Sequence, residues 1–522
     1  MNATRSLSTS RILFLLGAVL FAQCLRAQEV YDWEPWLASR NPAGLVASSS
    51  PRHITSGSFI DAEAQLYGGF TSGDFRSLSD AKLRWNTGAG ASAQAYFPDM
   101  LLLGDFSFDL MGGDNMQGSM FTTPGYYPID IYEFTPGRKT RQTYSIGGGA
   151  AWINKSRFIP AATVRFKGIN YSKRKDLRHT TYRQEVEAVP SLLYNGDAFR
   201  VGLSYVFLKT SEYVKAEQIG AATADSYYAF LDKGLMYGTY QVWNGSGTHL
   251  AEAGVDRLPV KEISHGVSLQ AEVGEWLYAD VEYDYSKGEV GEKGYTWYRF
   301  PGHSLAANLQ GTIHAASGVH VLRLEYDWKG QQTHETVLER VTTGGVTVPE
   351  EHGSNRIFER REMHLKPSWK AYFNSGLEVG VWALYSHTVQ LSSLVYPYEY
   401  HDASRHLTVG GELNANLGPF ELESALLLGT KIGEHVYTVD NVDPSLGLLT
   451  VPYHLSEWRL ALDELSDVTQ MTARLCLRYP FTLAGKYKLF VQAACTYTSA
   501  FGVIYLPGDK RQETLITLGY KF

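Results

Sequence analysis

The chain has 522 residues, of which 44% are hydrophobic, 19% are charged and only 3 are cysteines, and its formal net charge is −7 at pH 7. This balance excludes a disordered chain and a disulfide scaffold, and a mildly acidic chain without a basic footprint is not expected to bind nucleic acid. Past residue 22, no apolar run approaches the roughly 18 residues that a membrane-spanning helix needs.

Residues 1–27 have the features of a secretory signal peptide. A basic start precedes an apolar core over residues 12–22, and Leu25-Arg26-Ala27 fits a signal-peptidase cleavage site. Cys24 leaves a lipoprotein open as the alternative. We therefore expect export, and we expect residues 28–58 to form a periplasmic or plug segment ahead of the first strand.

Period-two alternation runs through residues 59–522. In residues 277–286, for example, the odd-numbered positions are apolar or tyrosine, whereas the even-numbered positions include Asp280, Glu282 and Asp284. Such strands reach ten residues or more, which is longer than the roughly five or six residues of strands in globular sheets. One face of each strand is therefore apolar, and the other is small, polar or charged.

The alternation predicts eighteen strands, with sixteen or fourteen as alternatives; the boundaries also allow one hairpin more or fewer. They are expected near residues 59–69, 82–97, 101–112, 143–153, 159–174, 183–195, 199–215, 262–274, 276–289, 302–315, 319–333, 362–373, 377–393, 404–417, 420–434, 468–481, 486–499 and 511–522.

The connections between these strands alternate in length. Short turns with glycine, asparagine or proline alternate with longer loops, the longest being residues 113–142, 216–261, 334–361 and 435–467. Short turns on one side and long loops on the other are typical of a transmembrane outer-membrane antiparallel β-barrel. A closed barrel pairs every backbone group that would otherwise face lipid, so the apolar face should turn outward. The alternative is an extracellular sandwich, propeller or β-helix, although no 20–50-residue repeat is present.

The chain ends on a strand with Ile516, Leu518, Tyr520 and Phe522 on one face. A terminal aromatic residue behind alternating apolar residues resembles the C-terminal targeting strand of bacterial outer-membrane proteins. The resemblance implies that the barrel-assembly machinery recognises this strand and that the barrel lies among the lipids of a Gram-negative outer membrane.

A second resemblance lies near the start of the exported chain. Asn41-Pro42-Ala43-Gly44 resembles an element of the long-chain fatty-acid (FadL-type) transporters, in which the region before strand one forms a hatch in the lumen. Eighteen strands depart from the fourteen of that family, so no lipid-binding residue is carried over. As a whole, the chain most resembles uncharacterised outer-membrane barrels of Bacteroidetes, which implies a location and a fold but no substrate.

Charged residues on the polar faces are the candidates for lining the lumen. There they would set the electrostatic field that a solute meets, or they would form ion-pair ladders that stiffen the wall or hold a plug. The candidates are Asp280, Glu282, Asp284, Arg323, Glu325, Lys366, Lys370, Glu412, Glu421, Glu423, Arg474 and Arg478.

Catalytic and metal-binding patterns are missing from the sequence. It contains no GxSxG or HExxH motif, and the adjacent pairs Ser264–His265 and Ser386–His387 would point to opposite faces of their strands. We expect no enzyme activity, no cofactor and no metal site. Alternation also places Cys476 toward the lumen and Cys495 toward lipid, which predicts two free thiols.

One loop has a helical pattern. Residues 456–468 place Trp458, Leu462 and Leu465 on one face of a short helix, which could cover the mouth, constrict it or remain an inert loop helix. The function that we expect is a porin-like or FadL-like channel for a small solute. The alternative is a non-transporting surface barrel that acts in adhesion, assembly or as a scaffold through its long extracellular loops.

Overall fold

The structure is a computed structural model. The predicted signal peptide and Phe522 lie outside the residues that it describes, and of the expected segment 28–58 it covers only residues 33–47. None of the described helices is long and apolar enough to cross a membrane. The described residues are 33–47, 59–153, 156–175, 177–217, 227–236, 238–243, 257–292, 295–395, 398–433, 436–439, 455–485 and 487–521.

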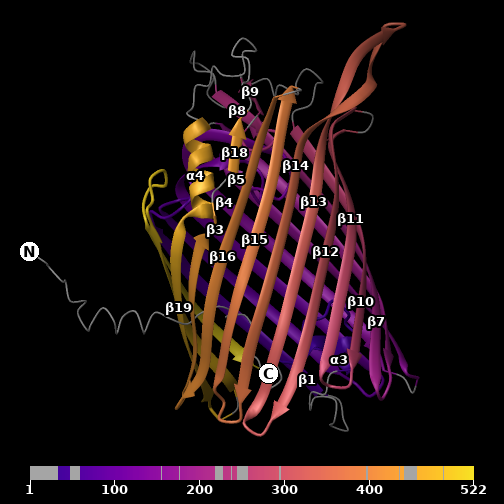
Figure 1. Ribbon diagram of the computed structural model, residues 1–522, viewed down its shortest axis with the longest axis vertical. Coiled ribbons are helices and arrows are strands. Elements are labelled where there is room, and N and C mark those ends of the chain that lie inside the picture. The colour runs from indigo at the N-terminus through magenta and orange to yellow at the C-terminus, as the bar shows by residue number, and fades with distance from the viewer. Residues whose placement is uncertain are drawn as a thin grey trace, which may run out of the picture.

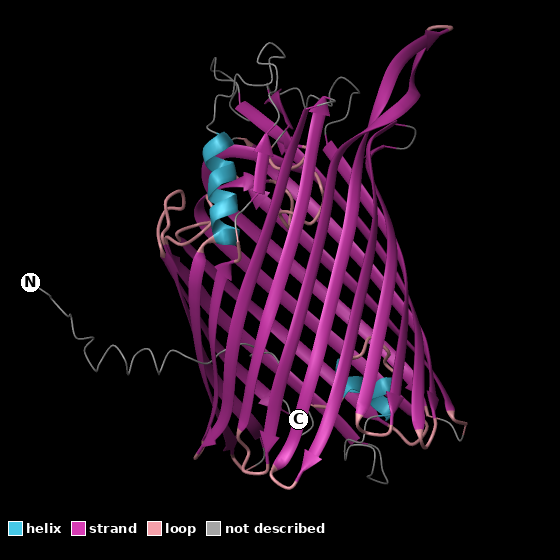
Figure 2. Cartoon of the chain, viewed as in Figure 1, coloured by secondary structure: helices cyan, strands magenta, loops and turns pink. Residues whose placement is uncertain are grey.

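The fold is an outer-membrane β-barrel of antiparallel strands (Figures 1 and 2). One sheet holds 21 strands, and three short additions leave eighteen in the wall. The wall strands are β1 (Phe59–Gly73), β2 (Leu83–Tyr96), β3 (Met100–Ser119), β4 (Asp130–Trp152), β5 (Phe158–Lys173), β6 (Arg178–Asn195), β7 (Phe199–Glu217), β10 (Arg257–Val273), β11 (Leu277–Glu292), β12 (Tyr295–Ala315), β13 (Gly318–Thr343), β14 (Val346–Phe373), β15 (Glu378–Val395), β16 (Tyr398–Leu417), β17 (Phe420–Lys431), β19 (Thr469–Leu483), β20 (Tyr487–Phe501) and β21 (Lys510–Lys521).

The remaining elements are short. The additions to the sheet are β8 (Tyr227–Asp232), β9 (Gly238–Trp243) and β18 (Val436–Val439), and the helices are α2 (Pro35–Ala38), α3 (Gly44–Ala47) and α4 (Leu455–Asp467).

The barrel closes between its first and last strands. β1 pairs with β21 from Glu63 opposite Lys521 to Gly73 opposite Arg511. Around the inserted short strands, β7 pairs directly with β10, and β17 pairs directly with β19. No wall strand therefore keeps an open edge, and the predicted closed eighteen-stranded barrel is confirmed.

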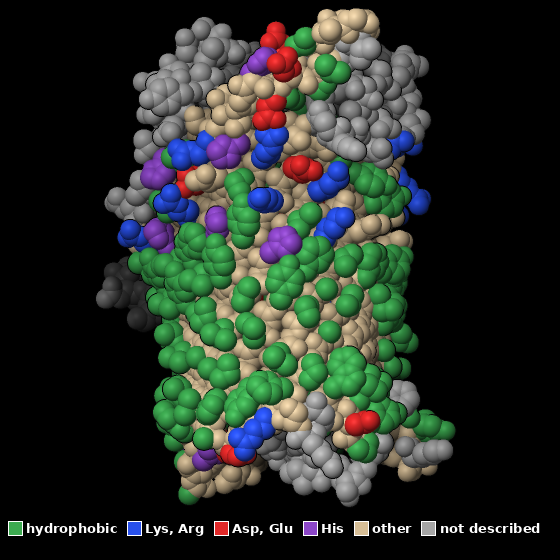
Figure 3. Space-filling model, turned by 90° about the vertical axis from the view of Figure 1, so that its right-hand side faces the viewer, with side chains coloured by type: hydrophobic (Ala, Val, Ile, Leu, Met, Phe, Trp, Pro, Cys, Tyr) green, Lys and Arg blue, Asp and Glu red, His purple; other side chains and the backbone are tan. Residues whose placement is uncertain are grey.

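Apolar side chains cover the outside of the wall. On β11, Val281 and Tyr283 are 45% and 48% exposed, and on β21 Ile516 and Leu518 are exposed whereas Thr517 between them is buried. Figure 3 shows the hydrophobic side chains as a broad zone over the lower part of the barrel. This outward apolar band meets lipid, as the alternation predicted.

The rim of the barrel is uneven. β13 and β14 have 26 and 28 residues and continue beyond the wall as a projecting hairpin, whereas β17 and β21 have 12 each (Figure 1). The prediction of loops at 334–361 and 113–142 was therefore wrong, since β13 and β14 fill the first segment and β3 and β4 most of the second. The projecting part has charged and polar residues on both faces, with a few valines between them, so the sequence lacks the regular apolar alternation that marks strands in lipid.

Candidate functional site in the barrel lumen

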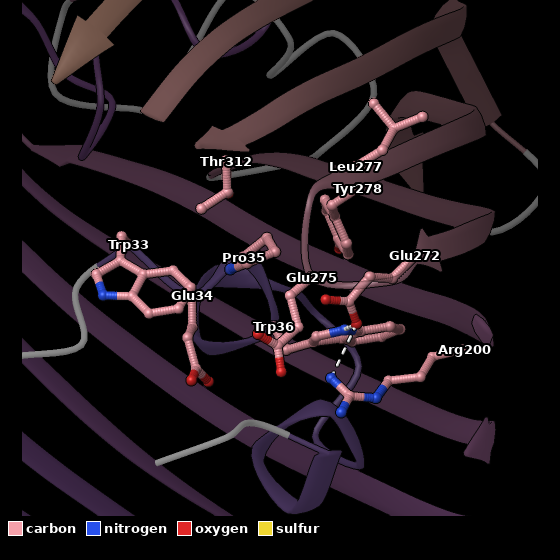
Figure 4. A pocket seen from close by; sticks show the side chains of 10 residues that line it. All are labelled: Trp33, Glu34, Pro35, Trp36, Arg200, Glu272, Glu275, Leu277, Tyr278 and Thr312. Carbon is pink, nitrogen blue, oxygen red and sulfur yellow. Dashed lines mark hydrogen bonds and ion pairs between the residues drawn. The ribbon is translucent and has the colours of Figure 1, made fainter. Parts of the chain in front are cut away.

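Residues 33–47 lie inside the barrel at the end with the short turns. The Trp36 indole Nε1 donates to the Glu272 carboxylate at 2.5 Å, and Arg200 approaches the same carboxylate at 3.0 Å. The Trp36 ring also meets Tyr278 edge to face, with 5.3 Å between centroids. Figure 4 shows these side chains converging around the segment, which β7, β10 and β11 hold from the wall.

Asn41 anchors the same segment. Its buried amide donates to the Leu192 carbonyl and to Gln270, both at 3.3 Å, and its Oδ1 accepts from the Ala43 backbone N–H at 3.0 Å. The last contact is an Asx-turn, which starts α3. Gly44 is required there, because a Cβ would stand 2.7 Å from the Trp36 ring. The Asn-Pro-Ala-Gly element is thus a tight turn seated on the wall.

Arg40 connects the segment to the acidic row of β11. Its guanidinium lies 3.1 Å from Glu282 and 3.6 Å from Glu187, and its side chain is 48% exposed. In the same row, Asp280 accepts from Tyr278 at 3.3 Å and Asp284 accepts from Ser304 at 3.1 Å. The three carboxylates therefore have separate partners, and one of them holds the N-terminal segment.

A ladder of ion pairs runs along β13 to β16. Glu325 receives Lys366 at 2.9 Å and Arg323 at 3.8 Å. Lys370 lies 3.0 Å from Glu378 and 3.4 Å from Glu412. Such partly exposed pairs fix side-chain positions more than they stabilise the fold.

A second group of ion pairs joins strands on both sides of the closure. Arg478 on β19 lies 3.7 Å from Glu421 on β17 and 3.6 Å from Glu63 on β1, and it stacks 3.8 Å from the Phe490 ring. Glu423 and Arg474 take inner positions on the same strands, with Glu423 opposite Cys476 and Arg474 opposite Ala425. All twelve candidates thus lie on the inner face, and at least eight of them belong to ion pairs.

The opposite end of the lumen is crossed by the connection between β3 and β4. Buried Phe121, Tyr127 and Ile129 from this connection belong to one cluster with Val260 on β10 and Phe300 on β12. At its tip, the Gly125 carbonyl accepts from Arg360 on β14 at 3.1 Å. β4 and β14 are eight strands apart in a ring of eighteen, so this contact spans the lumen. We call residues 120–129 the mouth loop.

Polar contacts hold the mouth loop from the wall. The Arg183 guanidinium lies 3.7 Å from the centroid of the Tyr126 ring, and the Thr122 N–H donates to Glu212 at 2.8 Å. Burial, with Glu262 as a smaller cause, raises the pKa of Tyr126 to about 12, so its hydroxyl stays neutral at physiological pH. None of these contacts was predicted from the sequence.

The base of the mouth loop is fixed by buried charges. Glu133 pairs with Lys139 at 2.9 Å and also with Lys173, and all three side chains are fully buried. Removing Glu133 would leave two buried ammonium groups without their carboxylate, at a cost of about 3–5 kcal/mol. β8 pairs with the same stretch of β4, from Asp130 opposite Asp232 onward, so part of the predicted loop 216–261 is a second layer on the mouth.

Helix α4 completes the mouth. It spans Leu455–Asp467, which confirms the helix predicted at 456–468. Trp458 meets Phe134 at 5.4 Å between ring centroids, and Leu462 packs against the same cluster. The predicted apolar face therefore packs against the mouth rather than facing solvent.

Between the two ends, inner side chains remain open to water. On β5 and β3, Arg165 and Asp105 form a 3.1 Å pair, yet their side chains are 54% and 40% exposed, and Lys167 is 40% exposed. Asp105 and Arg165 each stand opposite Gly147 on β4 in the register. Val164, the residue before Arg165, is exposed on the outer face, so Arg165 and Asp105 point into the lumen. The described residues thus leave an open, charged middle section in the lumen, which we call the chamber.

The described residues show neither a metal-binding group nor a disulfide. Within the described ranges, no group of three or more histidine, cysteine, aspartate or glutamate side chains is placed to hold a metal ion. Cys476 is buried and free, and Cys495 on the neighbouring strand is also free. The register puts Cys495 opposite Leu475, so the two thiols point to opposite faces as predicted.

Comparisons with known proteins give a family and a set of distant barrels. The model of a family of unknown function, DUF6850, matches residues 61–522. No curated protein matches the chain. The alcaligin outer-membrane receptor FauA of Bordetella pertussis is similar at 9% identity and a TM-score of 0.40, over 89% of this chain and 76% of FauA.

Two Pseudomonas aeruginosa structures are similar to the same extent. A mutant of the ferric enterobactin receptor PfeA has 8% identity and a TM-score of 0.39, over 89% of this chain and 81% of PfeA. OpdO has 11% identity and a TM-score of 0.35, over 89% of this chain and 97% of OpdO. Similarities of this size do not indicate what this chain binds.

Proposed function

The chain belongs to the DUF6850 family, whose function is unknown, and from its lumen we propose that it is a porin-like channel that passes a small polar solute through the outer membrane. The observation that carries the proposal is the chamber, where Arg165, Asp105 and Lys167 line the inner wall and stay 40–54% exposed. Barrels of 16 to 18 strands are wide enough for an aqueous channel when nothing fills them.

The two ends of the lumen support a restricted channel rather than an open pore. The mouth loop crosses one end of the lumen. Residues 33–47 lie against the inner wall at the other end, and we propose that they act as the plug. A segment before strand one that lies in the lumen is also the arrangement that the FadL resemblance implies. Charges of both signs line the chamber, so we expect the solute to be polar and small. We propose no enzyme activity for this lumen.

The proposed location follows from the ends of the chain. We propose that residues 1–27 direct export and that the barrel-assembly machinery of a Gram-negative bacterium recognises the C-terminal strand, through the outward face of Ile516, Leu518 and Tyr520 together with the terminal Phe522. The outward exposure of Ile516 and Leu518 supports this proposal, because β21 is the strand that closes the barrel against β1 and these side chains point away from the lumen.

The test is solute flux through the purified full-length barrel. We expect discrete conductance steps in planar bilayers and swelling of proteoliposomes in the smallest neutral sugars, with swelling lost as the sugar grows. A variant in which a two-residue turn replaces residues 337–356 of the projecting hairpin is the control, and its flux should match that of the wild type. If the folded barrel gives neither conductance nor swelling with the smallest sugar, the channel proposal is wrong.

One observation favours the second candidate, a surface barrel that does not transport. In the projecting hairpin, residues 351–356 are all exposed, and Val337 and Val348 are 44% and 50% exposed. A long two-stranded arm outside the wall could hold a partner at the cell surface. If the shortened hairpin variant lost cell-surface adhesion and the wild type showed no flux, this second candidate would be correct.

A further inference from the structure

Basic side chains gather on the outer surface of the barrel, directly above the apolar band. Figure 3 shows lysine, arginine and histidine side chains in this zone, with few acidic ones among them. The described strands β7, β10, β11 and β12 contribute a compact set of exposed residues. We call this set the outward basic cluster: Lys209, Lys261, His265, Lys287 and His303.

The strand register places three lysines around one apolar side chain. Ile263 on β10 stands opposite Lys209 on β7 and opposite Lys287 on β11, and it is 39% exposed on the outer face. Two strand spacings separate Lys209 from Lys287, which is roughly 10 Å, and Lys261 lies two residues from Ile263, which is roughly 7 Å. Three ammonium groups therefore surround one point on the outer surface.

The cluster marks the upper edge of the part of the wall that faces lipid. On β10, the next outward residues toward the short turns are Val267 and Leu269, each 53% exposed. Tyrosines lie at the same edge and bind both histidines: Tyr205 Oη lies 2.6 Å from His265 Nδ1, and Tyr283 Oη lies 2.7 Å from the equivalent atom of His303. Tyrosines at this height form the aromatic belt of membrane proteins, where lipid headgroups begin.

The lysines of the cluster lack protein counter-ions. Across the ranges that the structure describes, no carboxylate lies within ion-pair distance of Lys209, Lys261 or Lys287, although Arg299 above them pairs with Glu351. Among the described residues, Glu289 is an outward acid nearby and stands opposite Lys261 in the register. Lys287 also lies over the Tyr285 ring, 5.4 Å from its centroid, a contact that leaves its positive charge uncompensated.

We propose that the outward basic cluster binds the phosphate-bearing headgroup of an anionic lipid in the outer leaflet of the membrane. Lysine ammonium groups at a membrane surface attract anionic headgroups, and phosphate oxygens accept strong charge-assisted hydrogen bonds. The lipid's acyl chains would lie on Val267 and Leu269 while its phosphates reach Lys209, Lys261 and Lys287. Lipid is favoured over a protein partner because the cluster continues directly into the apolar band.

The test measures lipid retention by the full-length barrel in neutral detergent. Native mass spectrometry would compare bisphosphorylated lipid A, the same lipid without its phosphates, phosphatidylglycerol and phosphatidylcholine. We expect the phosphorylated lipids to bind at least about ten-fold more tightly than the uncharged ones, and we expect salt to weaken this preference. The variant K209Q/K261Q/K287Q should lose the preference.

A second triple variant controls for charge. It removes three exposed lysines elsewhere, K82Q/K488Q/K510Q, and should keep the preference of the wild type. The shift in gel mobility on heating confirms that each variant forms a barrel. The proposal fails if phosphorylated and dephosphorylated lipid bind equally, if both triple variants behave alike, or if inorganic phosphate alone displaces the lipid fully. It also fails if the cluster variant changes self-association instead of lipid binding.

Discussion

Single side chains decide how firmly the mouth loop is held. Tyr126 lies under the buried guanidinium of Arg183, and a desolvated cation–π contact of this kind contributes about 2 kcal/mol. We expect Tyr126→Ala to lower the free energy of unfolding by at least that amount and to expose the mouth loop to protease. Tyr126→Phe keeps the ring and should behave almost as the wild type. Equal losses for the two variants in denaturant unfolding would contradict the stacking interpretation.

Glu464 ties helix α4 to the connection between β20 and β21. The Glu464 carboxylate accepts the backbone N–H groups of Ile504, Tyr505 and Leu506 at 2.6–2.7 Å. We expect Glu464→Ala to speed amide hydrogen exchange at these three positions and to cost about 1–3 kcal/mol locally. Glu464→Gln keeps one acceptor and should be intermediate. Exchange rates that stay unchanged in Glu464→Ala would show that other contacts hold residues 504–506 in place.

At the residue scale, the sequence could predict faces but not partners. Period two decides which side of the wall a residue occupies, so all twelve charged candidates reached the inner face. Their partners include residues outside the alternating region, such as Arg40, and residues brought close only by closure, such as Glu63. Trp36 and Glu272 are 236 positions apart, and no local pattern joins them.

The projecting hairpin is the element with the clearest pH dependence. Arg299 on β12 donates to both oxygens of Glu351 on β14, at 2.5 and 2.7 Å, and this hydrogen bonding holds the pKa of the Glu351 carboxyl below its ordinary value. A lowered pKa means that the tether is complete at neutral pH and is lost as the pH falls through the pKa of the folded state. We therefore expect the hairpin to be released only in acid, at a pH below the ordinary pKa of a glutamate carboxyl.

Spin labels on the hairpin and on the wall would measure this release. One label at Thr343 and one at Leu309, in a background with Cys476→Ser and Cys495→Ser, should give a narrow distance distribution at pH 7 that broadens at low pH. Arg299→Gln should be broad at both. A wild-type distribution that is the same at both pH values would exclude the Arg299–Glu351 pair as the tether.

At the scale of elements, predictability followed the environment of each strand. Strands in lipid carry alternation because one face must be apolar, and their existence was predicted throughout the wall. The projecting hairpin has water on both faces, so its polar sequence resembled a loop. Helix α4 was predictable because it buries Trp458, Leu462 and Leu465 along one side, a pattern of period 3.6 that survives in a loop.

At the scale of the whole molecule, composition indicated one barrel but not what occupies it. The chain is rich in glycine and tyrosine, and its hydrophobic fraction is modest. A lipid-facing surface, a wet lumen and polar loops together give such a composition. Whether a loop crosses the lumen depends on contacts such as Arg360 with Gly125, between strands eight apart in the ring. Such contacts leave no periodic signal, so the mouth loop was missed while the wall was found.

The two closures of the lumen lie in series along the proposed path, and series resistances add. Replacing Phe121–Ile129 by a glycine-serine link opens the mouth, and Trp36→Ala with Asn41→Ala frees the other end. If both ends limit the same flow, the conductance gained by combining these changes must exceed the sum of the two separate gains. Independent paths through the barrel would instead give additive gains. Planar-bilayer conductance of the four proteins separates these cases, and a merely additive result would contradict a single chamber closed at both ends.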